Sequence, residues 1–394
     1  MGLSPRTGAA TAGEALSGRQ RPVRRRDAAA APAASIGTTV TALHGKETLR
    51  LLILGGSPAH IGGVETFCDR AAEALRRHDP GVDIMRIATG TAYFSCAKLP
   101  LVAKGLATLV RHRAGGRGLV WLQYVNLPDL GYLVAARLLG FRIVVTPHLG
   151  KNWRSVRNPM LRVLSRMLLG LADRIALLAR TQEEEIALPE RVPRSLIRTF
   201  LPAEVLAPRP APADAPAHLR LVHAGRLSEA KGSFLTIEVC ARLRDAGIPF
   251  SARLIGSADA DTRSRLVAMS ADLGLQREIE MIGWASPSEL MDHLRDADIL
   301  LHPSRIDSYP LIVLEAMASG TLPVAMDLAG ARDMIETYDG AIIGSRDPVE
   351  AAAKWLAESS LADVRRRGAQ QAERVRADFA WSEAAVMLAD ALRR

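Results

Sequence analysis

Two successive series of short apolar runs, each alternating with amphipathic stretches, constrain the fold of this chain more than any other feature. Continuous runs of Val, Ile and Leu are typical of parallel strands that are buried on both faces. The first series therefore predicts a parallel α/β sheet. Its predicted strands are Leu51–Leu54, Val82–Ile87, Leu119–Tyr124, Arg142–Thr146 and Arg174–Leu178, with helices over Gly63–Arg77 and Arg154–Leu171.

A proline- and alanine-rich stretch, Ala203–His218, is expected to link the two series. A chain of 394 residues usually forms two domains, and two such series predict two Rossmann-like domains that face each other across a cleft. Ligands of parallel sheets lie beyond the carboxyl ends of the strands, so the cleft is the expected active site. The second series predicts strands at Leu219–His223, Ser251–Ile255, Glu278–Ile282, Ile299–His302 and Pro323–Ala325, with helices over Ser233–Ala246 and Leu311–Ser319.

Composition excludes several other classes of protein. Apolar residues make up 48% of the chain, which is enough for real cores. Cys68, Cys96 and Cys240 are odd in number and far apart, which excludes a disulfide scaffold and a cysteine-based zinc site and fits a reducing compartment. No transmembrane span is expected, because two arginines interrupt the most apolar stretch, Tyr132–Val145.

The net charge of +9 is unevenly distributed along the chain: +4 over residues 1–47, +10 over 48–205 and −5 over 206–394. A basic protein can bind nucleic acid, an anionic membrane or an anionic substrate. Aromatic residues are only 4% of the chain, and no zinc finger or arginine-rich reading helix is found. No nucleic-acid partner is therefore expected.

Two basic segments bear on a membrane partner. Residues 1–47 contain Arg24–Arg26 but no apolar stretch follows them, which predicts a disordered tail, or an upstream start, rather than a signal peptide. In Lys151–Leu171, basic residues alternate with apolar ones, as in a helix that lies on anionic lipid. With Arg111–Arg113, this segment predicts docking on a membrane that holds a lipid-linked acceptor. The pattern favours the alternative, a core-facing helix with a charged outer face.

Two motifs carry features of an anion site. Gly55–Gly56 and Gly62–Gly63 flank a loop that opens a helix, where the backbone can approach an anion, although the spacing is not that of a dinucleotide site. A turn for tight packing explains them equally well. Arg226 and Lys231 follow the first strand of the second series, where two cations suit a diphosphate. Ordinary surface cations are the alternative, which their place at the strand end disfavours.

A third motif pairs Asp307 in a loop with Glu315 inside an apolar helix that begins near Pro310. The free amides after a helix-initiating proline can hold an anion. A buried acid is costly unless it binds ligand hydroxyls or pairs with a core arginine, and the sequence leaves both open.

Other acidic clusters are expected to be structural. The pairs Asp259/Asp261 and Asp296/Asp298 lack further ligands at metal spacing and are interpreted as surface acids, so no metal site is predicted. Glu183–Glu185 is interpreted as a solvated first turn of a helix.

These motifs, Gly62–Glu65, Gly225–Gly232 and Asp307–Gly320, resemble those of retaining glycosyltransferases of family 4, also called glycosyl transferases group 1, which have the GT-B fold. The resemblance runs from about Leu49 to the end of the chain. Residues 377–382 are similar to the segment with which this family crosses back to its first domain. The implied domains are a basic tail (1–47), an acceptor-side domain (48–205), a nucleotide-sugar-binding domain (206–375) and a returning helix (376–394).

The resemblance also implies roles for single residues. Arg226 and Lys231 would neutralise the diphosphate of a nucleotide-diphosphate sugar, and Glu315 would bind the ribose hydroxyls. Asp307 stands where the family has a Glu that holds donor-sugar hydroxyls, and His148 matches a His beside the donor sugar. The implied catalytic residues are thus His148 and Asp307. The other implied donor contacts are Gly62, Gly63, Pro310, Leu311 and Ile312.

The implied reaction is sugar transfer with retention to a hydroxyl of a lipid-linked or saccharide acceptor, in the synthesis of cell-surface polysaccharide or glycolipid, without metal or cofactor. Hydrolysis is disfavoured because no carboxylate pair at glycosidase spacing can be assigned. The predicted location is the cytoplasm, with a peripheral position on the inner face of the cytoplasmic membrane left open. Asp307 is shorter than the usual Glu, Ser308-Tyr309 replaces Gly-Phe, and an Asn-Gly pair before the linker is missing. A noncatalytic nucleotide-sugar-binding partner is therefore the alternative, ahead of an epimerase or phosphorylase.

Overall fold

The computed structural model describes residues 49–56, 63–79, 81–91, 96–114, 118–150, 154–207, 217–307, 309–344 and 346–394. All of them belong to one compact unit of the chain. The predicted basic tail, residues 1–47, lies outside these ranges, so its disorder stays a prediction. No helix in the described ranges is both long enough and apolar enough to cross a membrane.

The first sheet of the described chain has six parallel strands in the order β2-β1-β3-β4-β5-β6. The predicted apolar runs form its strands, with small changes at their ends and one short strand that the pattern missed. These strands are β1 (Leu49–Leu54), β2 (Val82–Ile87), β3 (Leu119–Tyr124), β4 (Arg142–Pro147), β5 (Arg174–Leu177) and β6 (Arg194–Leu196). The helices of this half are α1 (Gly63–His78), η1 (Cys96–Lys98), α2 (Leu99–Ala114), α3 (Asp129–Leu138), α4 (Arg154–Arg157), α5 (Pro159–Leu169) and α6 (Gln182–Glu185).

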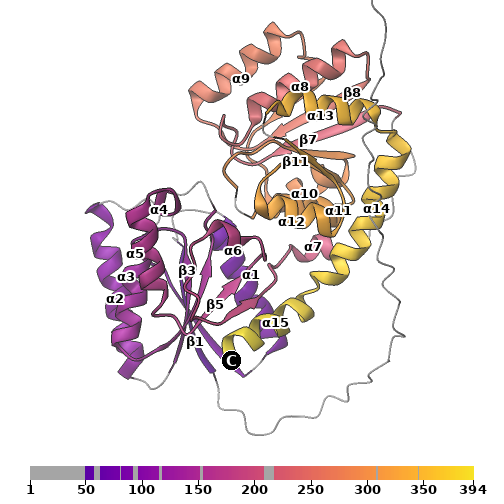
Figure 1. The fold of residues 1–394 in the computed structure, drawn as a ribbon. Helices are drawn as coiled ribbons and strands as arrows, with labels where there is room; N and C mark the ends of the chain where they lie inside the picture. Colours follow the sequence, from indigo (N-terminus) through magenta and orange to yellow (C-terminus); the bar gives the residue numbers. More distant parts are fainter. Residues whose placement is uncertain are drawn as a thin grey trace, which may run out of the picture. The chain divides into compact units, whose positions relative to one another are not determined.

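Helices cover both faces of the first sheet (Figure 1). Successive residues of a strand point to opposite faces, and β1 shows this directly. Leu51 and Ile53 pack under α1 and the last helix of the chain, α15 (Trp381–Arg393). Leu52 and Leu54 pack on the other face, under α2, α3 and α5. The strands are therefore buried on both sides, as their continuous apolar runs predict.

The second sheet also contains six parallel strands in the described chain, in the order β12-β11-β10-β7-β8-β9. Its strands are β7 (Leu219–Ala224), β8 (Phe250–Ile255), β9 (Ile279–Ile282), β10 (Ile299–His302), β11 (Leu322–Met326) and β12 (Ala341–Ile343). The helices are α7 (Ala203–Leu206), α8 (Ser233–Asp245), α9 (Ala260–Asp272), α10 (Pro287–Arg295), α11 (Leu311–Ser319), α12 (Ala329–Thr337), α13 (Pro348–Glu358) and α14 (Leu361–Asp378).

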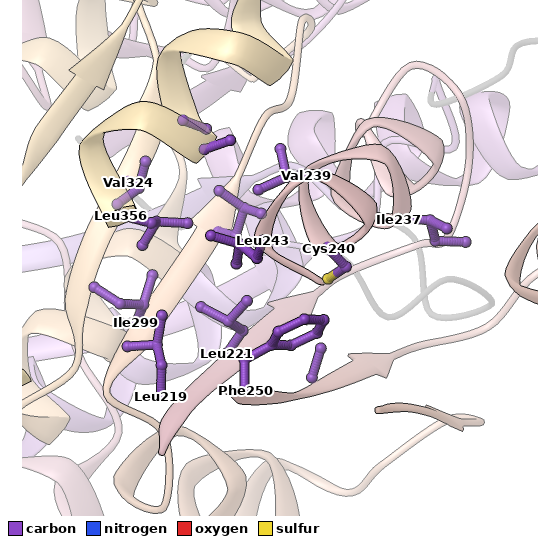
Figure 2. Close-up of a cluster of buried hydrophobic side chains, with 14 of the residues drawn as sticks. Leu219, Leu221, Ile237, Val239, Cys240, Leu243, Phe250, Ile299, Val324 and Leu356 are labelled. Atoms are coloured by element: carbon purple, nitrogen blue, oxygen red, sulfur yellow. The ribbon is translucent and has the colours of Figure 1, made fainter. Parts of the chain in front are cut away.

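The core under α8 and α13 is built from apolar side chains of the strands and of these helices. Figure 2 shows Leu219 and Leu221 of β7 facing Leu243 of α8 and Leu356 of α13. The opposite face of the sheet is covered by α10, α11, α12 and α14. The prediction of two α/β sheets, each covered by helices, is confirmed.

Two predicted segments differ from the structure. The predicted helix Arg154–Leu171 is two helices, because the Asn158 side chain accepts a hydrogen bond from Leu161 N (3.2 Å) and starts a new helix at Pro159. Asparagine caps and a proline in the first turn favour a helix start at this point. The predicted linker Ala203–His218 begins with the helix α7, and residues 208–216 lie outside the described ranges.

The last helix, α15, packs in the core of the first sheet. Trp381 Nε1 donates a hydrogen bond to Leu201 O (2.7 Å), and its ring meets Phe200 edge to face at 6.3 Å. Arg393 forms an ion pair with Asp79. The exact domain boundaries stay a prediction.

Candidate functional site

Each sheet has one point at which the strand order reverses, and both points carry candidate residues. The second sheet reverses between β7 and β10, because each is followed along the chain by a strand on its own side. Arg226 and Lys231 follow β7, and Asp307 follows β10. Crevices beyond the carboxyl ends of strands at such reversals are where α/β sheets bind ligands. The first sheet reverses between β1 and β3, and His148 follows the neighbouring β4.

A cavity of about 770 Å³ collects most of these residues. The first half of the chain contributes Gly63 and His148 to its lining. Because both halves line it, the cavity lies where a two-domain α/β protein is expected to bind its substrate. Gly62 lies outside the described residues. From the second half, the lining includes Arg226, Lys231, Asp307 and Leu311, whereas Pro310, Ile312 and Glu315 are not part of it.

The loop between β7 and α8 is held by hydrogen bonds from both of its ends. Ser228 N donates to Ser233 Oγ (3.0 Å), which also shares a hydrogen bond with the buried His223 (3.0 Å). Gly232 has a φ of +80°, and a Cβ there would overlap the carbonyl of Pro303, so only glycine fits. This rigid loop presents Lys231 to the cavity while Arg226 stays exposed at its rim.

Lys231 and His302 both bind the carboxylate of Asp307. Lys231 Nζ donates to Oδ1, and His302 Nε2 donates to Oδ2 at 2.9 Å. Burial alone would raise the pKa of Asp307, but the hydrogen bond and charge of His302 and the charge of Lys231 more than offset it and lower that pKa. Asp307 is therefore a fixed anion at the cavity wall, and Lys231 is partly neutralised by it.

The helix α11 begins at the cavity. Its N-cap is Pro310, whose side chain cannot cap the helix, and Leu311 in the first turn lines the cavity. The first amides of a helix have no partner within it and carry part of the positive end of the helix dipole. The amides of Leu311 and Ile312 are thus suited to an anionic group in the cavity.

Glu315 is paired with an arginine of the first half. Arg70 of α1 donates from Nη1 to Glu315 Oε1 (3.2 Å) and to Phe200 O (3.1 Å). Glu315 is 8% exposed, and burial raises the pKa of its carboxyl although Arg70 opposes this shift. The sequence left open a pairing of Glu315 with a core arginine, and the structure shows this pairing.

His148 is held by Gln123, a residue that the sequence pattern did not single out. His148 Nε2 and Gln123 Oε1 share a hydrogen bond of 2.8 Å, and the His148 backbone N donates to Tyr124 O (2.8 Å). The ring of Phe67 meets the imidazole edge to face at 5.4 Å. Burial lowers the pKa of His148 to about 4, so its imidazole is neutral near pH 7. The position of Gln123 near the carboxyl end of β3 was the available signal.

Burial also lowers the pKa of His223 to about 4, and this predicts a loss of stability in acid. The unfolded chain binds the proton near the ordinary pKa of 6.5, so folding is favoured above that pH and this stability is lost as the pH falls toward 4. At about 1.4 kcal/mol per pKa unit, His223 should contribute about 3 kcal/mol. The variant His223→Gln should lose less free energy of unfolding over this range than the wild type.

Chemical denaturation of both proteins at several pH values measures the difference. The matched control is His112→Gln on α2, which lies outside the core and should follow the wild-type curve. Parallel curves for the wild type and His223→Gln would contradict a buried neutral histidine.

The acidic pairs are structural, but one of them is not at the surface. Asp298 is 3% exposed and is bound by Arg220 (2.8 Å) and Arg365 (2.9 Å), so its interpretation as a surface acid is wrong. A buried carboxylate between two arginines is well compensated. Asp259 caps α9 by accepting from Thr262 N (2.7 Å) and also lines the cavity. In the described part of the chain, no group of three His, Cys, Asp or Glu side chains is placed to hold a metal ion.

Comparison with known proteins agrees with this geometry. Residues 215–374 match the family described as "Glycosyl transferases group 1". The D-inositol 3-phosphate glycosyltransferase of Thermobispora bispora is 29% identical over 83% of this chain and 84% of its own length. The amylovoran biosynthesis glycosyltransferase AmsK of Erwinia amylovora is 32% identical over 30% of each chain.

The solved structure of Anabaena Alr3699/HepE, in complex with UDP and glucose, superposes with a TM-score of 0.66. It is 16% identical and covers 88% of this chain and 99% of its own, and this likeness shows the GT-B fold. The second sheet and its cavity residues lie within the matched segment. The match of residues 215–374, the relatives and the fold together identify the chain as a glycosyltransferase with the GT-B fold that is similar to the group 1 glycosyl transferases.

Proposed function

We propose that the chain moves a sugar from a nucleotide-diphosphate sugar to a hydroxyl of a saccharide or lipid-linked acceptor, in the synthesis of a cell-surface polysaccharide or glycolipid. The observation that carries this is the meeting of Arg226, Lys231 and the first turn of α11 at one cavity. Its volume suits a small ligand. AmsK, named for amylovoran biosynthesis, supports the polysaccharide context.

The proposed donor site stabilises the leaving diphosphate. As the bond from the anomeric carbon to the diphosphate oxygen breaks, negative charge grows on that oxygen. Arg226 offers a bidentate contact, Lys231 a point charge, and the amides of Leu311 and Ile312 the end of a helix dipole. Such fixed groups stabilise developing charge without reorganisation. The proposal therefore uses no metal or cofactor.

Glu315 is the proposed partner of the nucleotide ribose. Arg70 binds its Oε1 atom, so the other carboxylate oxygen is the one proposed to accept the ribose hydroxyls. Arg70 also provides the counter-ion for the buried carboxylate of Glu315. Arg70 would thus position Glu315 for the donor.

The proposed transfer retains the anomeric configuration. The acceptor oxygen bonds to the anomeric carbon on the face that the diphosphate leaves, and the acceptor proton passes to a diphosphate oxygen. His148, neutral and held by Gln123, would hydrogen-bond a hydroxyl of the donor sugar, as would Asp307. Asp307 keeps Lys231 and His302 in place at the same time.

A second candidate function is a noncatalytic partner that binds nucleotide sugars. It is favoured by Asp307, whose two oxygens already accept from Lys231 and His302. Less of this carboxylate is then available to a donor sugar.

The two functions separate in one experiment. The purified chain is incubated with labelled nucleotide sugars and with saccharide and lipid-extract acceptors, and nucleotide binding is measured by calorimetry. Transfer of label supports the enzyme, and binding without transfer supports the noncatalytic partner. The absence of both transfer and nucleotide binding would refute both functions.

The proposed site of action is the cytoplasm, where the thiols of Cys68 and Cys240, both buried and free, would stay reduced. A lipid-linked acceptor would also hold the enzyme at a membrane surface.

A further inference from the structure

The helix α5 exposes a stripe of large apolar side chains to solvent. Met160, Val163, Leu164 and Met167 are 82%, 57%, 42% and 67% exposed. Their spacing of three and four residues places them on one face of the helix. We call this feature the α5 stripe. The sequence interpretation of a core-facing helix with a charged outer face is therefore incomplete, because the outer face is apolar as well as charged.

The α5 stripe is not the face that holds the helix to the protein. That face is formed by Ser165 and Leu169, which are buried, and by Leu168, which packs on the core under α5. The helix therefore has two apolar faces but needs only one for the core. Soluble monomers rarely expose apolar side chains that lie side by side, and such patches usually mark an interaction surface.

The surface around the α5 stripe is strongly basic. The helices α2, α3, α4 and α5 together contain eight Lys and Arg but a single acid, Asp129, which is buried. Within the described residues, acids outside these helices also reach them: Asp173 pairs with Arg137 and Glu190 with Arg166. Arg157 and Arg162 are exposed, Arg162 on α5 itself and Arg157 on α4, which packs against α5. The partner should therefore be apolar and anionic at once.

The α5 stripe also begins near the cavity. A helix that connects two parallel strands runs antiparallel to them, so its first turn lies at the carboxyl edge of the sheet. The first turn of α5, with Met160, is thus at the same edge as His148, which follows β4. A surface docked on α5 would bring its acceptors close to the proposed donor site.

We propose that the α5 stripe and its arginines anchor the protein on an anionic lipid bilayer. Met160, Val163, Leu164 and Met167 enter the boundary between headgroups and acyl chains, while Arg157 and Arg162 bind lipid phosphates. Interfacial helices bind by this combination of apolar burial and attraction to anionic lipid. The purpose of the anchor rests on the proposed lipid-linked acceptor.

A second copy of the chain is a poorer occupant of this surface. A two-fold interface brings the same patch of both subunits together. The exposed arginines of α4 and α5, Arg157 and Arg162, would then face their own copies. Like charges repel, whereas an anionic bilayer attracts them.

Co-sedimentation of the full chain with vesicles at low salt tests the anchor. We expect binding to vesicles of phosphatidylcholine with phosphatidylglycerol and little binding to phosphatidylcholine alone. The variants Val163→Ser/Met167→Ser and Arg157→Gln/Arg162→Gln should each weaken binding by about tenfold or more. The matched controls are Val267→Ser/Val386→Ser and Arg263→Gln/Arg265→Gln, which change exposed residues of α9 and α15 and should bind as the wild type does.

Three results would overturn the anchor: no preference for anionic vesicles, equal losses in the control variants, or a dimer in light scattering that the α5 variants dissociate. Transfer to a water-soluble acceptor is measured on the same proteins. It should be unchanged in the α5 variants, because none of their residues lines the cavity. Vesicle binding without any transfer would refute the proposed function but support the anchor. Transfer without vesicle binding would support the proposed function and refute the anchor.

Discussion

Replacing Arg226 or Lys231 by alanine should lower kcat/KM for sugar transfer by about 10²- to 10³-fold each, the cost of removing one group that stabilises a developing oxyanion. Both side chains line the cavity beside the first turn of α11. Nucleotide affinity measured by calorimetry should fall as well, because the diphosphate loses a counter-charge. The effect should be largest for donors that carry the intact diphosphate and small for a nucleoside.

Lys231→Ala has a second consequence, because Lys231 is also bound to Asp307. Loss of its charge should raise the pKa of Asp307, leaving His302 as the donor to this carboxylate. Lys231→Arg keeps the charge and should recover part of the activity. Comparison of these two variants shows how much of the effect is due to the charge of Lys231 and how much to the shape of its side chain.

The matched control for both cations is Arg263→Ala, which removes an exposed arginine from α9 outside the cavity. Its kinetics should equal those of the wild type. Unchanged nucleotide affinity and turnover in Arg226→Ala and Lys231→Ala would place the diphosphate elsewhere and refute the donor site.

The sequence predicted the sheets well, and the residues of the second half that line the cavity follow its predicted strands, for the same physical reason. Strands buried on both faces are continuous apolar runs, and their carboxyl ends meet at one edge of a sheet. Arg226, Lys231 and Asp307 each follow such a run by a few residues, so the cavity could be expected without coordinates. The break before Pro159 was also readable, from the asparagine and proline that start a helix.

The partners of the site residues could not be predicted in this way. Arg70 and Glu315 are 245 residues apart, and Gln123 and His148 lie on different strands, so no local pattern joins them. Asp298 looked like a surface acid because its arginines, Arg220 and Arg365, are also distant in sequence. Exposure is likewise set by the whole fold, and for this reason the apolar face of α5 was misread as core.

Breaking the ion pair of Arg70 and Glu315 should strongly lower the free energy of unfolding. Arg70→Ala leaves a buried carboxylate without its cation, and removing one partner of a buried ion pair costs about 3–5 kcal/mol. The free energy of unfolding, measured by chemical denaturation, should fall by this amount near pH 7. In the double variant Arg70→Ala/Glu315→Gln, no charge is buried, so most of the loss should be recovered.

The pH dependence gives a second readout of the same pair. Burial raises the pKa of Glu315 above its ordinary value of 4.5, and loss of Arg70 should raise it further. A carboxyl that holds its proton more tightly in the folded state makes folding more favourable at low pH, and this stability is lost as the pH rises through the folded pKa. Arg70→Ala should therefore be nearly as stable as the wild type below pH 4.5 and progressively less stable above it.

Arg76→Ala, which removes an exposed arginine from the same helix, is the matched control and should change stability by no more than about 0.5 kcal/mol. A double variant as unstable as Arg70→Ala would show that Arg70 stabilises α1 through Phe200 O rather than by compensating Glu315. Nucleotide adds the functional test. If Glu315 binds the ribose, nucleotide should raise the unfolding free energy of the wild type more than that of Glu315→Gln. Equal stabilisation of both would leave Glu315 a partner of Arg70 alone.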